Sequence, residues 1–217
     1  DGWRAVIAED FTFANVARVA QATADFWKSE IGNQKSEIFK RPAKVIVGYD
    51  RRFLSDRFAQ VTAEVFAANY FQVILTPEPT PTPSVSFAVK NLGAVGGVMI
   101  TASHNPPQFN GFKLKSHFGG SSSAEECQAV EKLLDAAAPK QIGNRQSAIV
   151  NFDVRPAHFA AIKKLVDFKL IAKSKLRVAH DALFGVGAGV FETLLAKTNC
   201  TVTTLPSRPS WHRTAGT

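Results

Sequence analysis

Apolar residues along the first two thirds of the chain alternate between a helical and an extended spacing. The helical spacing predicts helices in three segments: 13–27, 55–70 and 124–137. Short apolar runs predict strands, most of them buried, in four segments: 44–49, 73–75, 95–101 and 112–115. The segment Thr76–Pro83 contains four prolines, which a helix interior does not tolerate. We therefore expect the next helix to begin at Pro83 or Ser84 and to end at Leu92.

The alternation restarts after a linker predicted at residues 139–147. Beyond it we predict a helix at 155–168, a strand at 176–180, a helix ending at Lys197 and a strand at 202–205. Strands that alternate with helices indicate an α/β fold with a mostly parallel sheet. Two strands and two helices make a thin core for an independent domain. The glycines at 185–189 resemble a phosphate-binding loop only weakly, and a closely packed turn is the favoured interpretation.

The composition is typical of a soluble globular protein, with 45% of the 217 residues hydrophobic and 20% charged. We expect no membrane span, since no apolar run approaches about 20 residues. We expect no signal peptide either, because the segment from Asp1 to Asp10 is mixed and includes acidic residues. Cys127 and Cys200 are too few for a disulfide framework, so a reduced, cytoplasmic setting is expected. The net charge of +8 is spread along the chain without a basic block. This distribution favours a small anionic ligand over nucleic acid.

The segment Thr101–Pro107 (TASHNPP) carries the candidate chemistry. It leaves the C-terminal end of a predicted buried strand, where ligands bind in open α/β sheets. Asn110-Gly111 then supplies a turn, and the returning strand should bring Lys113 back towards Ser103. A serine hydroxyl is a weak nucleophile until a base takes its proton, and a nearby cation favours a phosphorylated serine. The alternative is a polar turn whose side chains hydrogen-bond to the backbone.

TASHNP followed by NGFK, at 101–106 and 110–113, resembles the active-site serine loop of the α-D-phosphohexomutases, the phosphoglucomutase/phosphomannomutase family. Three further stretches resemble elements of that family in the same order: Gly2–Thr12, Gly48–Arg52 and Thr80–Pro83. The resemblance covers about residues 1–205. It implies a three-layer α/β/α domain with a mixed, mostly parallel sheet at 1–145 and part of a second α/β domain at 150–205. A tail at 206–217 does not continue the family pattern.

The resemblance implies a mutase that interconverts hexose 1-phosphate and hexose 6-phosphate through a phosphoserine and a hexose 1,6-bisphosphate. Ser103 would carry the phosphoryl group. Lys113 would handle a hydroxyl proton or hold phosphoryl oxygens, and the first task requires a lowered pKa. Arg4 would stabilise the spread negative charge, and His104 would be a second proton-handling or substrate-contacting residue.

Arg52 and the metal ion complete the predicted site. Arg52 is a candidate substrate-binding residue, while an ion pair with Asp50 or Asp56 is an equally consistent role. In the family, Mg²⁺ is held by the phosphoserine and an Asp-x-Asp-x-Asp-Arg loop. This sequence contains no Asp-x-Asp pattern, so Ser103, through its phosphoryl group, is the one metal ligand predicted in this chain.

Three functional hypotheses follow. The first is a phosphohexomutase whose missing domains belong to the same polypeptide, acting on hexose phosphates with neither nucleic acid nor membrane as a partner. The second is a truncated fragment without turnover, which contacts another protein through uncovered apolar surface. The third is a serine hydrolase. It would require an oxyanion hole and a converging histidine and acid, and the sequence has no Gly-x-Ser-x-Gly elbow.

Overall fold

The computed structural model describes residues 2–33 and 43–205, so the tail predicted at 206–217 lies outside the described residues. The chain divides into two units, Asp1–Val154 and Arg155–Thr217. The elements of the first unit are β1 (Gly2–Val6), α1 (Phe13–Asn33), β2 (Lys44–Tyr49), α2 (Ser55–Ala68), β3 (Gln72–Leu75), α3 (Thr82–Asn91), β4 (Gly96–Ile100), β5 (Phe109–Ser116), α4 (Ala124–Lys132), a 3₁₀ turn (Gln146–Ala148) and β6 (Ile149–Asn151). Those of the second are α5 (Arg155–Leu165), α6 (Phe168–Lys173), β7 (Arg177–His180), α7 (Val190–Leu195) and β8 (Thr201–Thr204). No helix among these described elements is long and apolar enough to cross a membrane.

The first unit is built on a six-stranded sheet with the strand order β1-β5-β4-β2-β3-β6. β4, β2, β3 and β6 are parallel neighbours, whereas β5 is antiparallel to both β4 and β1. Successive parallel strands need a crossover connection, and α2 provides it between β2 and β3, whereas α3 provides it between β3 and β4. The mixed, mostly parallel sheet confirms the predicted α/β fold class.

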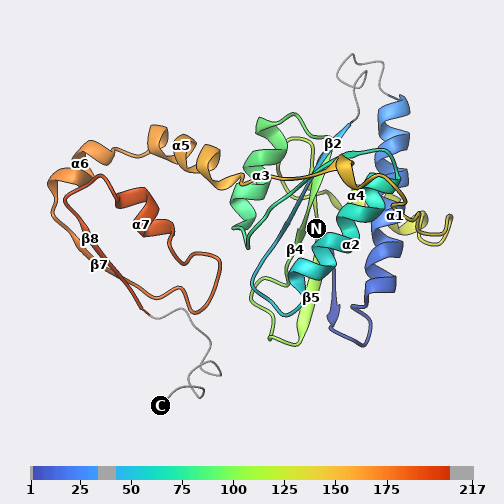
Figure 1. Ribbon diagram of the computed structural model, residues 1–217, viewed down its shortest axis with the longest axis horizontal. Helices are drawn as coiled ribbons and strands as arrows, with labels where there is room; N and C mark the ends of the chain where they lie inside the picture. Colours follow the sequence, from blue (N-terminus) through green and yellow to red (C-terminus); the bar gives the residue numbers. More distant parts are fainter. Residues whose placement is uncertain (1, 34–42, 206–217) are drawn as a thin grey trace. The chain divides into compact units, whose positions relative to one another are not determined.

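Helices cover both faces of this sheet (Figure 1). A Cβ added to Gly96 would meet the ring of Trp27 from α1, whereas a Cβ added to Gly97 would meet Val89 from α3. Neighbouring residues of a strand point to opposite faces, so α1 and α3 lie on opposite sides of the sheet. α2 and α4 both pack against α1. The result is the three-layer α/β/α arrangement that the sequence resemblance implied.

An aromatic cluster fills the core between the sheet and the helices α1 and α2. Phe11 is fully buried. Its ring stacks on Trp3 with ring centroids 4.8 Å apart and meets Phe58 edge-on at 4.7 Å. Such ring pairs contribute about 0.5–1.5 kcal/mol beyond the burial of their surface. Phe11 therefore ties the turn after β1 to α2, and this contact holds β1 at the edge of the sheet.

The second unit has little core of its own. Its sheet is a parallel pair in which Arg177 lies opposite Thr201. Within the described part of this unit, Leu195 is the single buried residue. Large apolar side chains are exposed instead, including Leu165 at 87% and Leu183 at 78%. Burying them would require other apolar surface.

The two edge strands of the main sheet were not predicted. β1 carries Gly2 and Arg4 among its residues, so it lacks the run of apolar side chains that marks a buried strand. β6 has three residues and directly follows the segment interpreted as a linker. Both strands form because a neighbouring strand offers free backbone groups, which is information that their own sequence does not contain.

Three helix boundaries also differ from the prediction. α1 continues to Asn33, because polar residues after Trp27, such as the exposed Ser29 and Glu30, do not interrupt the helix. α4 ends at Lys132, and the chain beyond it turns through Asp135, whose φ is 63°. The helix predicted at 155–168 ends at Leu165 as α5, and a further helix that was not predicted, α6, begins at Phe168. Asp167 caps α6 by accepting a hydrogen bond from the next turn, so the chain restarts there as a separate helix.

Candidate active site

Ser103 lies in the loop that leaves the C-terminal end of β4. Its side chain is exposed and its φ of 55° is left-handed. Its backbone N–H donates to Oγ1 of Thr101 at 3.0 Å, and its own Oγ lies 3.4 Å from Nδ1 of His104. The Ser103 hydroxyl is therefore held on a defined turn and is open to a ligand arriving from solvent.

Arg4 and Lys113 come from the neighbouring strands β1 and β5. In the register of this pair, Gly2 lies opposite Lys113 and Arg4 lies opposite Gly111. Residues two apart on a strand share a face, so the side chains of Arg4 and Lys113 lie on the α3 side of the sheet. β5 also pairs with β4, and this places Lys113 opposite Met99 on the strand that leads into the serine loop. The antiparallel return predicted for the chain after the loop is present.

The two cations influence each other. Burial lowers the pKa of Lys113 below the ordinary lysine value, and the positive charge of Arg4 lowers that pKa further. Two cations on one face repel each other, and an anion bound between them would relieve that repulsion. This pair can therefore attract a phosphoryl group, and a lysine with a lowered pKa gives up its proton more readily.

Arg52 lies in the turn after β2, and its guanidinium contacts the serine loop. Its Nη1 and Nη2 atoms donate to four backbone carbonyls of that loop: those of Ser103, Asn105, Pro106 and Phe109. Its Nε lies 3.4 Å from Oδ2 of Asp50. The ion pair with Asp50, one of the roles considered from the sequence, is thus present. The contact of Arg52 with substrate stays a prediction.

Two asparagines shape the loop from within. Asn110 is fully buried, and its Nδ2 donates to Oγ of Ser55 at 2.9 Å. Its Oδ1 accepts the backbone N–H of Gly111, also at 2.9 Å. The backbone N–H of Asn105 donates to the carbonyl of Ala102 at 3.0 Å. These contacts fix the entry and exit of the loop relative to β4 and β5.

The described residues do not by themselves provide a magnesium site. Residues 2–33 and 43–205 contain no group of three or more His, Cys, Asp or Glu side chains placed to hold a metal ion. The carboxylate of Asp50 reaches the loop, but it already accepts hydrogen bonds from Arg52, Ser55 and Thr101. Mg²⁺ requires several available oxygen ligands. Ligation of a metal ion by Ser103 through its phosphoryl group stays a prediction.

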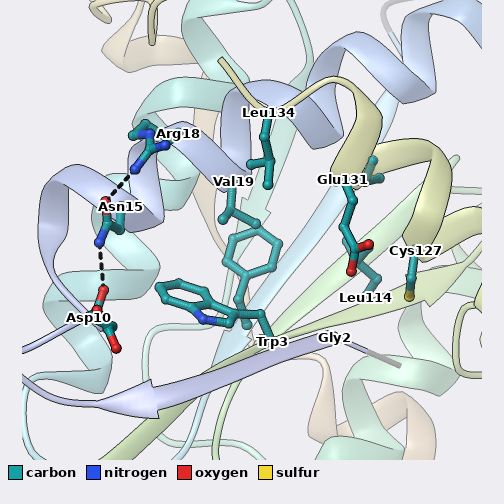
Figure 2. A pocket seen from close by; sticks show the side chains of 12 residues that line it. Gly2, Trp3, Asp10, Asn15, Arg18, Val19, Leu114, Cys127, Glu131 and Leu134 are labelled. Atoms are coloured by element: carbon teal, nitrogen blue, oxygen red, sulfur yellow. Dashed lines mark hydrogen bonds between the residues drawn. The ribbon is translucent and has the colours of Figure 1, made fainter. Parts of the chain in front are cut away.

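A pocket of about 520 Å³ lies between α1 and α4 above β1 and β5 (Figure 2). Apolar side chains, including Trp3 and Phe112, line it. Trp3 and Phe112 lie opposite each other in the register of these two strands. Both alternate with Arg4 and Lys113, so the pocket lies on the other face of the sheet from the two cations. It is therefore a separate feature from the predicted site.

Comparison with known proteins gives consistent matches for the first unit. The pattern described as phosphoglucomutase/phosphomannomutase, alpha/beta/alpha domain I, matches residues 1–141. A phosphoglucomutase from Staphylococcus epidermidis is 35% identical over 164 residues, covering 71% of this chain and 30% of that protein. A Haemophilus influenzae protein assigned as a phosphomannomutase is 31% identical over 166 residues, covering 73% of this chain and 34% of that protein. The chain thus spans about a third of the length of these relatives.

Solved structures give the same result. The crystal structure of a Thermus thermophilus protein assigned as a phosphomannomutase is similar with a TM-score of 0.81 and 35% identity, over 96% of this chain and 45% of that one. The open form of a Paramecium phosphoglucomutase, pp63/parafusin, has a TM-score of 0.80 at 15% identity, over 96% of this chain and 43% of that one. At that identity the second match shows the fold alone.

Proposed function

This chain belongs to the phosphoglucomutase/phosphomannomutase family, and on that premise we propose that its Ser103 is the phosphoryl carrier of a mutase that moves phosphate between carbon 1 and carbon 6 of a hexose. The observation that carries the proposal is the placement of the Ser103 hydroxyl. It is exposed on a turn at the C-terminal end of β4. The neighbouring strand β5 carries Lys113, and β1, which pairs with β5, carries Arg4. Ligands of open α/β sheets bind at this end of the strands.

Each predicted residue has a task in this proposal. The Ser103 oxygen takes a phosphoryl group from a hexose 1,6-bisphosphate and gives one to a hydroxyl of a hexose phosphate. Lys113 accepts or returns the hydroxyl proton, and the lowered pKa supports this role. Arg4 stabilises the negative charge spread over the transferring oxygens, because phosphoryl transfer depends mainly on positioning and charge neutralisation. His104, whose Nδ1 lies 3.4 Å from the serine Oγ, is the second proton-handling or substrate-contacting residue.

When bound, Mg²⁺ would supply further neutralising charge beside the phosphoserine. Its remaining ligands would come from acidic residues outside this chain, since the residues described do not fit the ion alone. Hexose phosphate, hexose bisphosphate and the missing domains of the same polypeptide are the partners in this proposal. A cytoplasmic setting stays a prediction from the cysteine content.

The second candidate is a chain that folds in part and turns nothing over. The many exposed apolar side chains of the second unit favour this for the chain in isolation. The first candidate describes a complete mutase and the second describes this chain alone. Assays of the complete protein and of the isolated chain therefore test them separately.

The experiment joins this chain to the remaining domains of the similar Thermus protein. We expect magnesium-dependent conversion of glucose 1-phosphate to glucose 6-phosphate by the joined protein, and none by the 217 residues alone. Ser103→Ala should abolish the activity, whereas Ser29→Ala, at an exposed serine on α1, should retain it. Activity that survives Ser103→Ala would exclude Ser103 as the carrier. Turnover by the isolated chain would exclude the second candidate.

A further inference from the structure

We propose that Arg52 is a positioning residue for Ser103, which it holds through the backbone carbonyls of the serine loop rather than by touching the substrate. The inference rests on the proposed function in one respect: it takes Ser103 as the group that needs positioning. The contacts themselves are independent of any phosphate chemistry.

The Arg52 guanidinium donates four hydrogen bonds to the serine loop and forms an ion pair with Asp50. The Nη2 atom donates to the carbonyls of Ser103 and Asn105, at 2.8 and 2.6 Å. The Nη1 atom donates to the carbonyls of Pro106 and Phe109, at 2.9 and 3.0 Å. The Nε atom faces the carboxylate of Asp50 at 3.4 Å. A guanidinium offers five donors in a fixed plane. The loop takes the four Nη donors and Nε is paired with Asp50, so a hydrogen bond from Arg52 to a substrate oxygen would compete with these contacts.

Asp50 links the same guanidinium to the start of the loop. Its Oδ2 accepts the hydroxyl of Thr101 at 2.6 Å, and the Thr101 oxygen in turn accepts the backbone N–H of Ser103 at 3.0 Å. Its Oδ1 accepts the backbone N–H of Arg52 at 2.9 Å and the hydroxyl of Ser55 at the same distance. The Asp50–Arg52 turn therefore forms hydrogen bonds with the loop both before and after Ser103 in the sequence.

The environment makes these contacts strong. The side chains of Arg52 and Asp50 are only 13% and 15% exposed. Hydrogen bonds from a charged donor are roughly twice as strong as neutral ones, and limited exposure reduces their screening by solvent. The left-handed φ of Ser103 is unfavourable for a residue other than glycine, so surrounding contacts must hold it in place. The Arg52 contact to the Ser103 carbonyl does this directly.

Lysine cannot reproduce this arrangement. An ammonium group has three donors on one atom and cannot reach carbonyls spread over the plane of a guanidinium. The neighbouring Arg51 is exposed, so it provides a matched control in which the same change is made one position away.

The first experiment measures amide hydrogen exchange in the full chain. In Arg52→Lys and Arg52→Gln we expect the amides of Asn105 and Phe109 to exchange at least about tenfold faster, relative to the amide of Val98 in β4. Arg51→Lys should leave all three amides unchanged. Unchanged exchange in the loop, or an equal acceleration at Val98, would overturn the proposal. Failure of both Arg52 variants to fold, while Arg51→Lys folds, would also overturn it, because a positioning role is local.

The second experiment uses the chain joined to the Thermus domains. Arg52→Lys should lower kcat at least about tenfold while KM for glucose 1-phosphate changes by less than about twofold. A raised KM with unchanged kcat would assign Arg52 to substrate contact and overturn the proposal. Failure of the proposed function has a different signature, since activity would then survive Ser103→Ala whatever the exchange data show.

Discussion

The side chain of Arg4 passes directly over Gly111, so that a Cβ added to Gly111 would lie 3.0 Å from Cγ of Arg4. The same Cβ would lie 2.6 Å from the carbonyl oxygen of Thr101. Gly111 therefore lets β1, β5 and the start of the serine loop approach one another. It also leaves the space through which Arg4 crosses the strand that carries Lys113.

Gly111→Ala should destabilise the chain by about 2–3 kcal/mol, because backbone atoms of neighbouring strands would have to move. The measurement is urea unfolding monitored by circular dichroism. Gly32→Ala is the control: a Cβ there meets nothing within 4 Å, and the residue lies in α1. We expect this control to be neutral or to stabilise by up to about 1 kcal/mol. Equal effects of the two changes would contradict the close approach around Gly111.

The Lys113 amine should titrate at lower pH than an ordinary lysine. Burial is the larger cause and Arg4 the smaller, so Arg4→Met should raise the pKa of Lys113 without restoring the ordinary value. The measurement is an NMR titration of isotopically labelled lysine side chains, with Lys113→Arg used to assign the resonance. A pKa of Lys113 that is not below the ordinary value would remove the support for its proton-handling role.

Lys115 should make the folded state more stable as pH rises. It is 5% exposed, its amine donates to Ser121 Oγ at 3.4 Å, and burial followed by the charge of Lys113 lowers its pKa. Between that lowered pKa and the unfolded value of about 10.4, the unfolded chain binds more protons, so the free energy of unfolding increases with pH. At pH values below the lowered pKa both states carry the proton, and the folded state bears the full cost of burying the charge.

Lys115→Met should therefore stabilise the chain at pH 7 by about 1 kcal/mol, and the gain should shrink towards pH 10. Urea unfolding at the two pH values tests this. Lys90→Met, at an exposed position on α3, should show no such gain at either pH. A gain from Lys115→Met that grows with pH would have the wrong sign for a lowered lysine pKa.

The N-terminus of α4 should depend on Ser123. Its hydroxyl accepts the N–H of Glu126 at 3.2 Å, and the Glu126 carboxylate accepts the N–H of Ser123 at 2.9 Å. Losing this capping box in Ser123→Ala should cost about 1 kcal/mol of unfolding free energy. Ser29→Ala serves as the comparison, because its hydroxyl bonds within an exposed helical turn and should matter little. A Ser123→Ala protein as stable as the unaltered chain would show that the cap contributes nothing.

The serine loop could be predicted because its chemistry is local in the sequence. The candidate nucleophile, the histidine and the returning lysine all lie between Thr101 and Lys113. The role of Arg52 could not be predicted in this way. Its contact to the Ser103 carbonyl spans 51 positions and exists because β2 and β4 are neighbours in the sheet. A pattern of residue types indicates which side chains can donate, but strand order decides what they reach.

The central strands of the fold were also predictable, and the edges were not. β2 and β4 lie between other strands and beneath helices on both faces, so their side chains are largely buried and their sequences are plainly apolar. β1 alternates between Trp3, which packs on Phe11, and Arg4, which lies on the opposite face of the sheet. Because its two faces have different surroundings, β1 contains no continuous run of apolar residues by which a strand could be predicted.

At position 103 the backbone conformation favours one residue type and the proposed reaction requires another. Glycine would adopt a φ of 55° without strain, but it has no oxygen to receive a phosphate. A library of this chain selected only for survival on heating should therefore drift towards glycine at this position. A library selected for phosphate transfer should keep serine and tolerate the lower melting temperature.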